Sequence, residues 1–441
     1  MLSMAPRASL DLGGGCRGLL RSVPASASAS AVAISRHAPS LPRSLGPLTP
    51  RRHLSGPYGY TQAKSLVFSK FGEPSDVLHL HRHSISPTLP DGAVLLRSLA
   101  VPVNPSDVNT IQGTYGVKPQ FSPLLGTPEP AAIPGNEGCF EVVAVGPGVK
   151  TLHRGDWAIP ATTGFGTFRT HAVAEHADRS LLRIGGDRGI DGLTPAQVAT
   201  VSVNPCSAYR MLRDYVDLIA QSVASFSKDP ATPGGAWFLQ NGANSGVGRA
   251  AIQLGALWGL RSINIIRERP TEEETSTLKS ELQSLGATVV LTEAEFLDRA
   301  FSTRLREEFT RGGRDPVLLG LNCVGGKSAA AVVRSLGPKG TMVTYGGMSR
   351  QSFPFPTGPQ IFKRLRFEGF WLSEWSKENP AEKRRTINEI VELMRDGKFK
   401  AAPVEEVQWD WDTEEKTLQQ AVQGTLEGFR SGKGLFVFRD T

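Results

Sequence analysis

The apolar residues between positions 64 and 175 fall into short runs that alternate with polar residues or are interrupted by Gly, Pro and Asp. Such runs, bounded by turn residues, are typical of strands that bury one face. The runs are KSLVF (64–68), VLHLHRH (77–83), AVLLRSLAV (93–101), GCFEVVAV (138–145), GDWAIPA (155–161) and GTFRTHAVAE (166–175). This part of the chain predicts a small, mostly-β, barrel-like domain.

The pattern changes near residue 195, and from 236 to 372 apolar strands alternate with helical stretches. Near-continuous apolar strands separated by helices predict a parallel sheet covered on both faces. The strand candidates are AWFLQ (236–240), RSINII (261–266), ATVVL (287–291), PVLLGLN (316–322), GTMVTYG (340–346) and LRFEGFWL (365–372). The helix after the first of these has an apolar stripe that we expect to face the sheet, formed by Val247, Ala250, Ala251, Leu254, Leu257 and Trp258.

The other segments complete the predicted organisation, which is that of an α/β protein. Residues 217–235 are polar and lack periodicity, so we interpret them as a surface insertion. The chain ends on GKGLFVFRD (432–440), which predicts a strand returning to the first domain. The predicted divisions are a leader (1–55), the first part of the mostly-β domain (56–205), the doubly wound parallel-sheet domain (206–374) and the return to the first domain (375–441).

Charge is unevenly distributed along the chain. Residues 1–55 contain seven arginines, no lysine and one acidic residue, while the rest contains 42 basic and 41 acidic residues. The net charge of +7 therefore comes from the leader and gives no indication of nucleic-acid binding. An Arg- and Ser-rich, acid-poor leader is the composition of a mitochondrial transit peptide, and a bland disordered tail is the alternative. No apolar run reaches the 18 residues expected of a membrane span.

Cysteine and histidine give little support for a metal site. The chain has four cysteines, and no Cys-x-x-Cys pair occurs among them. His79, His81 and His83 alternate and so share one strand face, which could bind a metal. We prefer a solvated strand face, because no cysteine or carboxylate set accompanies them.

The string FLQNGANSGVGRAAIQ (238–253) combines a strand end, a glycine-rich turn and a helix start. Glycines at 242, 246 and 248 let backbone N–H groups approach a pyrophosphate at the helix N-terminus. The spacing is not strictly G-x-G-x-x-G, but the position after the first strand of an alternating unit predicts a dinucleotide site. A tight turn without a ligand is the alternative.

The next strand ends on Arg267, Glu268 and Arg269, where such sites discriminate between NAD and NADP. A guanidinium can hold a 2′-phosphate through two charge-assisted hydrogen bonds, which favours NADPH. Glu268 could instead take the acidic role of an NAD site, and exposed charges without a ligand are a third reading.

Several distinctive strings occur between residue 60 and the end of the chain: NPSDVNTIQGTYG (104–116), GNEG (135–138), VNPCSAYRML (203–212), NSGVG (244–248), LNCVGGKS (321–328), GTMVTYGGM (340–348) and GFWLS (369–373). Through these strings the chain resembles mitochondrial trans-2-enoyl-CoA reductases, zinc-free members of the medium-chain dehydrogenase/reductase superfamily. The resemblance implies a GroES-like catalytic domain around a Rossmann domain, a homodimer, and NADPH-dependent reduction of enoyl-CoA or enoyl-acyl-carrier-protein thioesters in the mitochondrial matrix.

The resemblance also implies site residues. Tyr115 matches the family's proton donor, and the implied cofactor contacts are Asn204, Asn244, Ser245, Gly246, Val247, Arg267, Glu268, Arg269, Tyr345, Gly346, Gly347, Met348, Phe370, Trp371, Leu372, Ser373 and Lys433. Zinc-dependent alcohol dehydrogenases carry Gly-His-Glu where this chain has Gly135-Asn136-Glu137. Asparagine is a poor zinc ligand, so no metal is expected and the protein must supply its own acid. A tyrosine, with a reference pKa of about 10, is protonated at neutral pH and suits that task.

Three further features have competing interpretations. Cys206 has no evident base near it and is expected to pack at a helix start, while Asp107 is expected in a turn or N-cap. The run Lys363, Arg364 and Arg366 is hypothesised to meet CoA phosphates or an acidic carrier protein, with solvated surface charge as the alternative. A zinc-free NADPH quinone oxidoreductase and a non-catalytic NADPH-binding protein are the rival functions.

Overall fold

The computed structural model describes residues 57–218, 220, 235–353, 355–426 and 432–439, all within one compact unit, Arg51–Thr441. The predicted leader over 1–55 lies outside the described residues, as does most of the predicted insertion over 217–235. Both of these predictions stay untested.

The mostly-β part contains a seven-stranded sheet and a two-stranded sheet. In the larger sheet the strands follow the order β14-β15-β3-β4-β5-β7, and β6 also pairs with β3. β1 pairs with β2 in antiparallel register. The bounds are β1 (Thr61–Val67), β2 (His79–Ile85), β3 (Val94–Pro102), β4 (Cys139–Val145), β5 (Trp157–Pro160), β6 (His171–Ala174), β7 (Leu181–Arg183), β14 (Val404–Trp409) and β15 (Lys433–Phe438).

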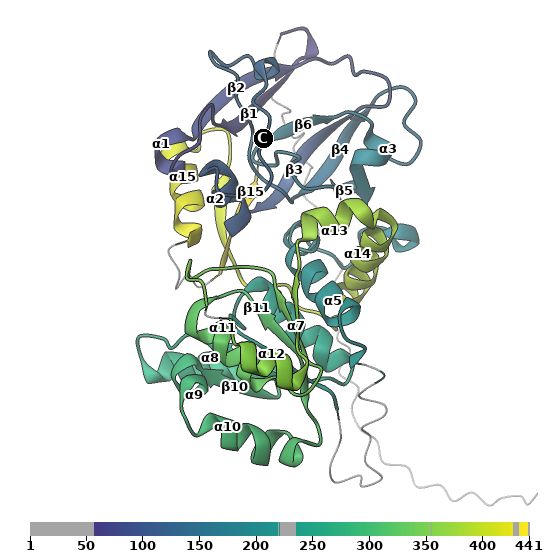
Figure 1. The fold of residues 1–441 in the computed structure, drawn as a ribbon. Helices are drawn as coiled ribbons and strands as arrows, with labels where there is room; N and C mark the ends of the chain where they lie inside the picture. The colour runs from purple at the N-terminus through teal and green to yellow at the C-terminus, as the bar shows by residue number, and fades with distance from the viewer. Residues whose placement is uncertain (1–56, 219, 221–234, 354, 427–431, 440–441) are drawn as a thin grey trace, which may run out of the picture. The chain divides into compact units, whose positions relative to one another are not determined.

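The chain's last strand returns to this part, as the sequence predicts. β15 lies antiparallel to β3, with Leu435 opposite Pro102, and parallel to β14. In Figure 1 the yellow elements β15 and α15 accordingly lie among the purple and blue elements of the first part. The Phe168, Trp409 and Phe436 side chains are fully buried and meet edge to face, which gives the two chain ends a common core.

The second sheet is six-stranded and parallel, in the order β10-β9-β8-β11-β12-β13. Its strands are β8 (Trp237–Gln240), β9 (Arg261–Ile266), β10 (Val289–Thr292), β11 (Val317–Asn322), β12 (Thr341–Thr344) and β13 (Arg366–Gly369). Five of the six fall inside the predicted segments, and β10 extends one residue beyond its segment, to Thr292. The order reverses between β8 and β11, so the sheet is doubly wound and has a crevice at the carboxyl ends of these two strands.

Helices cover the sheets and connect them. Those of the mostly-β part are α1 (Pro74–Val77), α2 (Pro105–Ile111), α3 (Ala177–Ser180), α4 (Pro195–Ala199) and α15 (Glu415–Gln423). Those around the parallel sheet are α5 (Asn204–Asp214), α7 (Gly246–Leu257), α8 (Glu272–Ser284), α9 (Glu293–Leu297), α10 (Phe301–Arg304), α11 (Gly326–Ser335), α12 (Thr357–Lys363), α13 (Leu372–Glu378) and α14 (Pro380–Arg395). Short 3-10 or π turns occupy Pro57–Gly59, Pro123–Leu125, Gly186–Arg188, Leu305–Phe309, Arg311–Gly313 and Gly424–Leu426.

The apolar stripe of α7 is confirmed except at Leu257. Ala251 and Leu254 have no exposed surface, and Trp258 packs against the core, whereas Leu257 is 43% exposed. The stripe prediction is therefore wrong for Leu257, which is the last residue of α7. Arg249 and Gln253 are buried instead, which periodicity would not predict for polar side chains.

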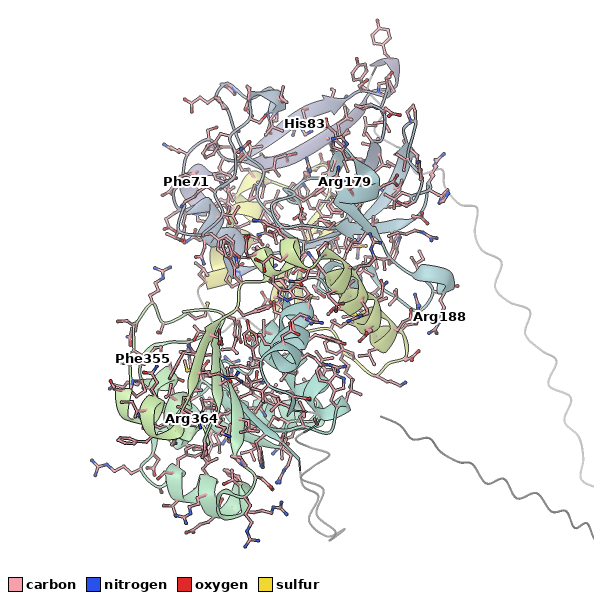
Figure 2. The ribbon with its side chains drawn as sticks, turned by 45° about the vertical axis from the view of Figure 1, so that its right-hand side comes forward. Phe71, His83, Arg179, Arg188, Phe355 and Arg364 are labelled. Carbon is pink, nitrogen blue, oxygen red and sulfur yellow. The ribbon has the colours of Figure 1, made fainter. Side chains whose placement is uncertain are left out.

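The histidines of β2 depart from the predicted solvated face. The rings of His81 and His83 stack with centroids 5.6 Å apart, and His81 Nε2 lies 2.7 Å from the Leu125 carbonyl oxygen. Burial lowers the pKa of His83 to about 4, helped by the nearby charge of Arg169. Only His79 is well exposed, and His83 lies on the small two-stranded sheet (Figure 2). A helix long and apolar enough to cross a membrane does not occur among the described residues.

Candidate functional site

The glycine-rich turn follows β8 and leads into α7. The Ser245 side chain caps the helix by accepting a hydrogen bond from the Gly248 N–H at 3.1 Å. The Asn244 side chain is held by Arg249, whose Nε donates to Asn244 Oδ1 at 2.9 Å. Arg249 in turn forms a bidentate pair with Glu281, at 2.7 and 2.9 Å. The α7 N-terminus is thus held in a defined position for an anion.

The glycines of this turn are required by packing. A side-chain carbon at Gly248 would lie 2.5 Å from the Ala243 carbonyl oxygen, and one at Gly246 would lie 2.8 Å from Asn204 Nδ2. Gly242 has a φ of +63°, and a side-chain carbon added there would lie 2.5 Å from Cys323 Sγ. These contacts bring the first turn of α5, with Asn204, against the nucleotide turn.

The candidate 2′-phosphate site lies one strand away, at the end of β9. Ile266 is the last residue of the strand, and Arg267 and Glu268 are exposed directly after it. The Arg269 backbone N–H donates to Thr275 Oγ1 at 2.9 Å, which joins this tip to the start of α8. Both guanidinium groups therefore belong to the carboxyl edge of the parallel sheet, as a 2′-phosphate site requires.

The other implied cofactor contacts lie at the same edge. Residues 345–348 follow β12, where the Tyr345 N–H donates to the Asn322 carbonyl and the Met348 N–H donates to the Cys323 carbonyl. Residues 370–373 follow β13, and the Phe370 N–H donates to the Thr344 carbonyl at 3.0 Å. Burial raises the pKa of Tyr345 well above its ordinary value, so this phenol stays protonated.

Tyr115 stands on the loop that follows α2. The backbone N–H groups of Thr114 and Tyr115 both donate to the Asn109 carbonyl, which fixes the loop. A side-chain carbon at Gly113 would lie 2.7 Å from the Phe71 ring, so only glycine fits there. Gly116 lies against the Trp371 ring, where a side-chain carbon would come within 3.1 Å.

The tyrosine meets a residue from the other sheet. Trp371 Nε1 donates a hydrogen bond to the Tyr115 hydroxyl oxygen at 3.0 Å, and the two rings meet edge to face with centroids 6.1 Å apart. Tyr115 and Trp371 are 256 positions apart in the sequence. This bond joins the mostly-β part to the residues that follow β13.

Tyr115 also lines a cavity of about 450 Å³ in the mostly-β part. The cavity is lined by apolar side chains and by several polar and charged ones. Its lining includes Val117, Leu125, Ala131, Ile133, Pro134, Asn136, Gly164, Phe165 and Arg169. Burial lowers the pKa of Arg169 to about 10, and its Nη2 donates to the Phe165 carbonyl at 3.0 Å.

A second cavity, of about 570 Å³, is lined both by Asn109 and Thr114 from the Tyr115 loop and by Gly347 and Met348 from the cofactor edge. Another of about 560 Å³ lies at the opposite, amino end of the parallel strands, near Val317. The first two cavities include residues of the candidate site, and the third includes none of them.

A buried polar cluster lies between the Tyr115 loop and the nucleotide turn. Asn104 Nδ2 donates to Glu137 Oε1 at 2.8 Å, and Lys433 Nζ lies 2.5 Å from Asn104 Oδ1 and 3.5 Å from Glu137 Oε1. Glu137 is fully buried, and its other oxygen accepts from Ser202 and from the Val203 N–H. Lys433 therefore pairs with a buried carboxylate, and it also borders the small cavity beside Gly246.

Asp107 belongs to the same cluster. Its carboxylate accepts from the Asn104 backbone N–H at 2.7 Å. The N-cap of α2 is therefore Asn104, and Asp107 is the N3 partner of a capping box rather than the predicted N-cap itself. Its other oxygen accepts from Asn136 Nδ2 at 2.6 Å. Burial raises the pKa of Asp107 to about 7, and the charge of Glu137 adds to this effect, while Lys433 opposes it.

The remaining sequence hypotheses can be placed as well. Cys206 is fully buried in the first turn of α5, and burial raises its pKa to about 12, which supports packing over nucleophilic chemistry. Lys363 Nζ donates to the Arg334 and Leu336 carbonyls, and Arg366 donates to the Tyr215 carbonyl and to Thr341. These bonds favour a structural role for Lys363 and Arg366, and a carrier contact by the run stays a hypothesis.

Sequence reasoning missed several residues of the site. Asn104 joins Glu137 and Lys433, and Arg249 holds Asn244. Arg169 lines the Tyr115 cavity. A signal for Asn104 was present, since Asn-Pro-Ser-Asp is a capping pattern, but Arg249 and Arg169 look like ordinary surface residues in the sequence.

The residues at the carboxyl edge of the parallel sheet fit a dinucleotide phosphate. They combine the α7 N-terminus, glycines without room for a side chain, and the guanidinium groups of Arg267 and Arg269 after β9. Groups of three or more His, Cys, Asp or Glu able to hold a metal ion do not occur in the part of the chain that the structure describes.

Two family models match the chain. The alcohol dehydrogenase GroES-like domain matches residues 90–204, and the zinc-binding dehydrogenase model matches residues 246–392. The fold and site therefore define a two-domain dehydrogenase with a GroES-like part and a Rossmann part.

Sequence relatives identify the family within this class of dehydrogenases. The mitochondrial enoyl-[acyl-carrier-protein] reductase of Yarrowia lipolytica is 44% identical over 342 residues, which cover 77% of this chain and 82% of the relative. A Kluyveromyces marxianus protein named NADPH quinone oxidoreductase is 36% identical over 353 residues, covering 80% and 87%. The chain belongs to the family of mitochondrial enoyl-[acyl-carrier-protein] reductases.

Solved structures agree with this assignment. The complex of Etr1p with NADP and crotonyl-CoA matches with a TM-score of 0.76 and 39% identity, covering 85% of this chain and 99% of that one. The Etr1p/Etr2p heterodimer from Candida tropicalis matches with a TM-score of 0.77 and 39% identity, covering 85% and 99%.

Proposed function

We propose that this protein reduces trans-2-enoyl thioesters of CoA or acyl carrier protein to saturated acyl thioesters with NADPH, and that Tyr115 donates the proton. The family is the first support, since its named members are enoyl-[acyl-carrier-protein] reductases and a similar structure contains NADP and crotonyl-CoA. The second support is the geometry around Tyr115.

The observation that carries the role of Tyr115 is its bond to Trp371. An indole N–H can only donate, so the Tyr115 oxygen accepts from Trp371 and its own hydrogen must be directed elsewhere. Because Tyr115 lines the 450 Å³ cavity, that hydrogen is available to a ligand there. Positioned general acids of this kind contribute about 10²–10⁴-fold to a rate.

The cofactor residues act by binding and orientation. We assign the pyrophosphate to the α7 N-terminus, with Asn244, Ser245, Gly246 and Val247, and the 2′-phosphate to Arg267 and Arg269. The remaining assigned contacts are Asn204, Glu268, Tyr345, Gly346, Gly347, Met348, Phe370, Trp371, Leu372, Ser373 and Lys433.

When bound, NADPH supplies a hydride to the β-carbon. Negative charge then develops on the thioester oxygen and the α-carbon. The proton that completes the reduction goes from the Tyr115 hydroxyl to the α-carbon. Solvent returns a proton to the tyrosinate before the next turnover.

The test follows NADPH oxidation with trans-2-hexenoyl-CoA, using wild type and Tyr115→Phe. We expect activity in the wild type that falls by about 10²–10⁴-fold in the variant, with NADPH binding unchanged. Unchanged turnover in Tyr115→Phe would exclude this residue as the proton donor.

A quinone is the second substrate in the same assay, since one relative is named NADPH quinone oxidoreductase. Activity with the quinone alone would replace the proposed function by that of a quinone reductase. NADPH binding with no oxidation by either substrate would indicate a non-catalytic protein.

We further propose that the protein is a homodimer, and a similar structure is a heterodimer of two related chains. β13 pairs only with β12 among the described strands, and its residues are largely exposed. On the adjoining α12, Ile361 is 60% and Phe362 is 87% exposed, and Phe355, which packs against Phe367 of β13, is 49% exposed. Phe355 and Arg364 both lie in the part of the molecule that holds this sheet (Figure 2).

Sedimentation of the wild type and of Phe362→Asp tests the dimer. We expect a dimer that dissociates in the variant, because a charge would be buried at the interface. A monomeric wild type would exclude the proposal.

The protein is mitochondrial. Its relatives are mitochondrial reductases, and its Arg- and Ser-rich leader has the composition of a transit peptide. The body of the chain, nearly neutral in charge, is expected in the matrix.

A further inference from the structure

The Asn136 side chain has a fixed orientation beside the Tyr115 cavity. The Gly164 N–H donates to Asn136 Oδ1 at 2.8 Å, so the oxygen end of the amide must face Gly164. The nitrogen end then faces Asp107, to which Nδ2 donates at 2.6 Å. The Gly164 donor and the Asp107 acceptor therefore determine which end of the Asn136 amide is oxygen and which is nitrogen.

One hydrogen of this amide is left over. An amide NH₂ carries two hydrogens, and the bond to Asp107 uses one of them. No second acceptor for Asn136 Nδ2 occurs among the residues that the structure describes. Asn136 is only partly buried and lines the 450 Å³ cavity together with Tyr115, so the second hydrogen has access to a ligand in that cavity.

We propose that this second N–H of Asn136 donates to the thioester oxygen of the substrate and stabilises the negative charge that develops there during reduction. The proposal rests on the proposed enoyl-thioester reductase function and names the group that polarises the carbonyl. Asn136 is then a catalytic residue, and Asp107 is the positioning residue that holds its amide.

Hydride from NADPH forms a bond to the β-carbon, and the electron pair of the carbon–carbon double bond moves to form an enolate with negative charge on the thioester oxygen. Asn136 stabilises this oxygen by a hydrogen bond and transfers no proton. The enolate pair then takes a proton from Tyr115 at the α-carbon, the carbonyl re-forms, and tyrosinate remains.

The environment strengthens Asn136 as a donor. Its acceptor is the Asp107 carboxylate, and hydrogen bonds to a charged partner polarise the groups in the chain. Asp107 itself cannot move away, because its other oxygen accepts from the Asn104 N–H at 2.7 Å. Donors fixed in advance at a developing oxyanion are worth about 10²–10³-fold in kcat.

Asn136→Asp is the selective variant. Its outer oxygen can still accept from Gly164, and its inner oxygen can share one proton with Asp107, so the fold and the total charge are conserved. The hydrogen available to the cavity is lost. Asn136→Ala, which removes the two observed bonds and the proposed one to substrate, is the second variant. Gln62→Ala, which removes an exposed amide bonded to Ser84, is the control.

Two readouts are measured: kcat and KM with trans-2-hexenoyl-CoA, and the absorption spectrum of trans,trans-2,4-hexadienoyl-CoA bound in the presence of NADP⁺. We expect kcat to fall by about 10²–10³-fold in both Asn136 variants with a much smaller change in KM. The wild type, Gln62→Ala and Tyr115→Phe should red-shift the bound dienoyl chromophore, because its carbonyl is polarised. Neither Asn136 variant should do so.

A red shift that persists in Asn136→Asp, or one that disappears in Tyr115→Phe instead, would overturn the proposal. A kcat equal to wild type in Asn136→Asp would do the same. Failure of the proposed function is distinguishable, because the wild type itself would then leave NADPH unoxidised in the presence of hexenoyl-CoA.

Discussion

The nucleotide turn and the buried cluster around Asp107 are two parts of one candidate site, and they are built differently. The turn is defined by backbone geometry: Gly242 has a positive φ, and Gly246 and Gly248 have no room for a side chain. The cluster is defined by polar side chains, in which Asn104, Glu137 and Lys433 meet across more than 300 positions. The turn depends on small residues at fixed spacing, and the cluster depends on matching charges and hydrogen bonds.

This difference predicts which substitutions should disrupt the turn and which should disrupt the cluster. One added methyl group is enough to disturb a turn in which backbone contacts backbone. A buried cluster tolerates changes of shape better than an unpaired charge, which costs several kcal/mol to leave in the interior. The following experiments separate the two modes.

The largest effect is expected from Gly248→Ala. The new side chain would lie 2.5 Å from the Ala243 carbonyl oxygen, and this backbone contact cannot relax by side-chain rotation. The α7 N-terminus must shift, so saturable NADPH binding measured by calorimetry should be lost. Gly358→Ala in α12 is the matched control, because no atom lies within 4 Å of the added carbon. Normal NADPH binding by Gly248→Ala would show that the turn is not the cofactor site.

Lys433→Met tests the cluster by leaving Glu137 buried without its cation. The Glu137 side chain is fully buried and that of Lys433 is 13% exposed. Breaking a buried pair in this way should lower the free energy of unfolding by about 3–5 kcal/mol, measured by urea denaturation. Lys398→Met, which removes an exposed lysine beside Asp396, should cost about 0–1 kcal/mol.

A double variant sharpens this result. Adding Glu137→Gln to Lys433→Met removes the uncompensated charge, so much of the lost stability should return. Equal instability of the single and double variants would mean that Lys433 stabilises the fold through packing.

Arg267→Ala and Arg269→Ala test the cofactor preference with the fold intact. Each guanidinium is expected to contribute about 1.5–3 kcal/mol through charged hydrogen bonds to the 2′-phosphate, so NADPH should bind about 10–100-fold more weakly. NADH affinity should be unchanged, because NADH lacks that phosphate. An equal loss for both nucleotides would contradict the assignment.

The smallest effect concerns pH. The pKa of Asp107 is raised to about 7, mainly by burial and further by Glu137, and is opposed by Lys433 and by hydrogen bonds from Asn104 and Asn136. Protonation below pH 7 removes an acceptor that holds Asn136, so kcat should fall by roughly tenfold per pH unit there, about 1.4 kcal/mol.

Protonation of Asp107 affects folding stability in the opposite direction to its effect on kcat. The folded state binds this proton more tightly than the unfolded state, so the group adds stability as pH falls from 7 towards 4 and adds none above 7. Unfolding of wild type and Asp107→Asn between pH 5 and 8 measures this difference. A difference in unfolding free energy that does not change with pH would mean that Asp107 does not titrate in this range.

Much of the fold could be predicted from the sequence. The strands of the parallel sheet, the helix after the nucleotide turn and the returning strand β15 fall in predicted segments, apart from Thr292 at the end of β10. Local patterns report which face of an element is buried, because period 2 and period 3.6 follow from backbone geometry. The exceptions are local as well: Leu257 leaves the α7 stripe at a helix end, and His81 and His83 are covered by a neighbouring loop.

The proposed site residues also fall into two groups, those that a local sequence pattern indicates and those that it does not. The turn glycines and the arginines after β9 could be proposed from the sequence, because a dinucleotide site needs a contiguous string and a fixed distance to the next strand end. Tyr115 could be identified only through resemblance to a family. Its partner Trp371 and the cavity it lines come from segments that no local pattern brings together.

By itself, then, the sequence determined the alternation of strands and helices and the composition of the leader, and it predicted the nucleotide turn and a preference for NADPH. Only the tertiary structure decided which polar groups meet: Trp371 with Tyr115, Lys433 with Glu137, and Asn136 between Asp107 and Gly164. The physical reason is that periodicity depends on neighbouring residues, while these contacts depend on how distant strands pair and which loops their ends bring together.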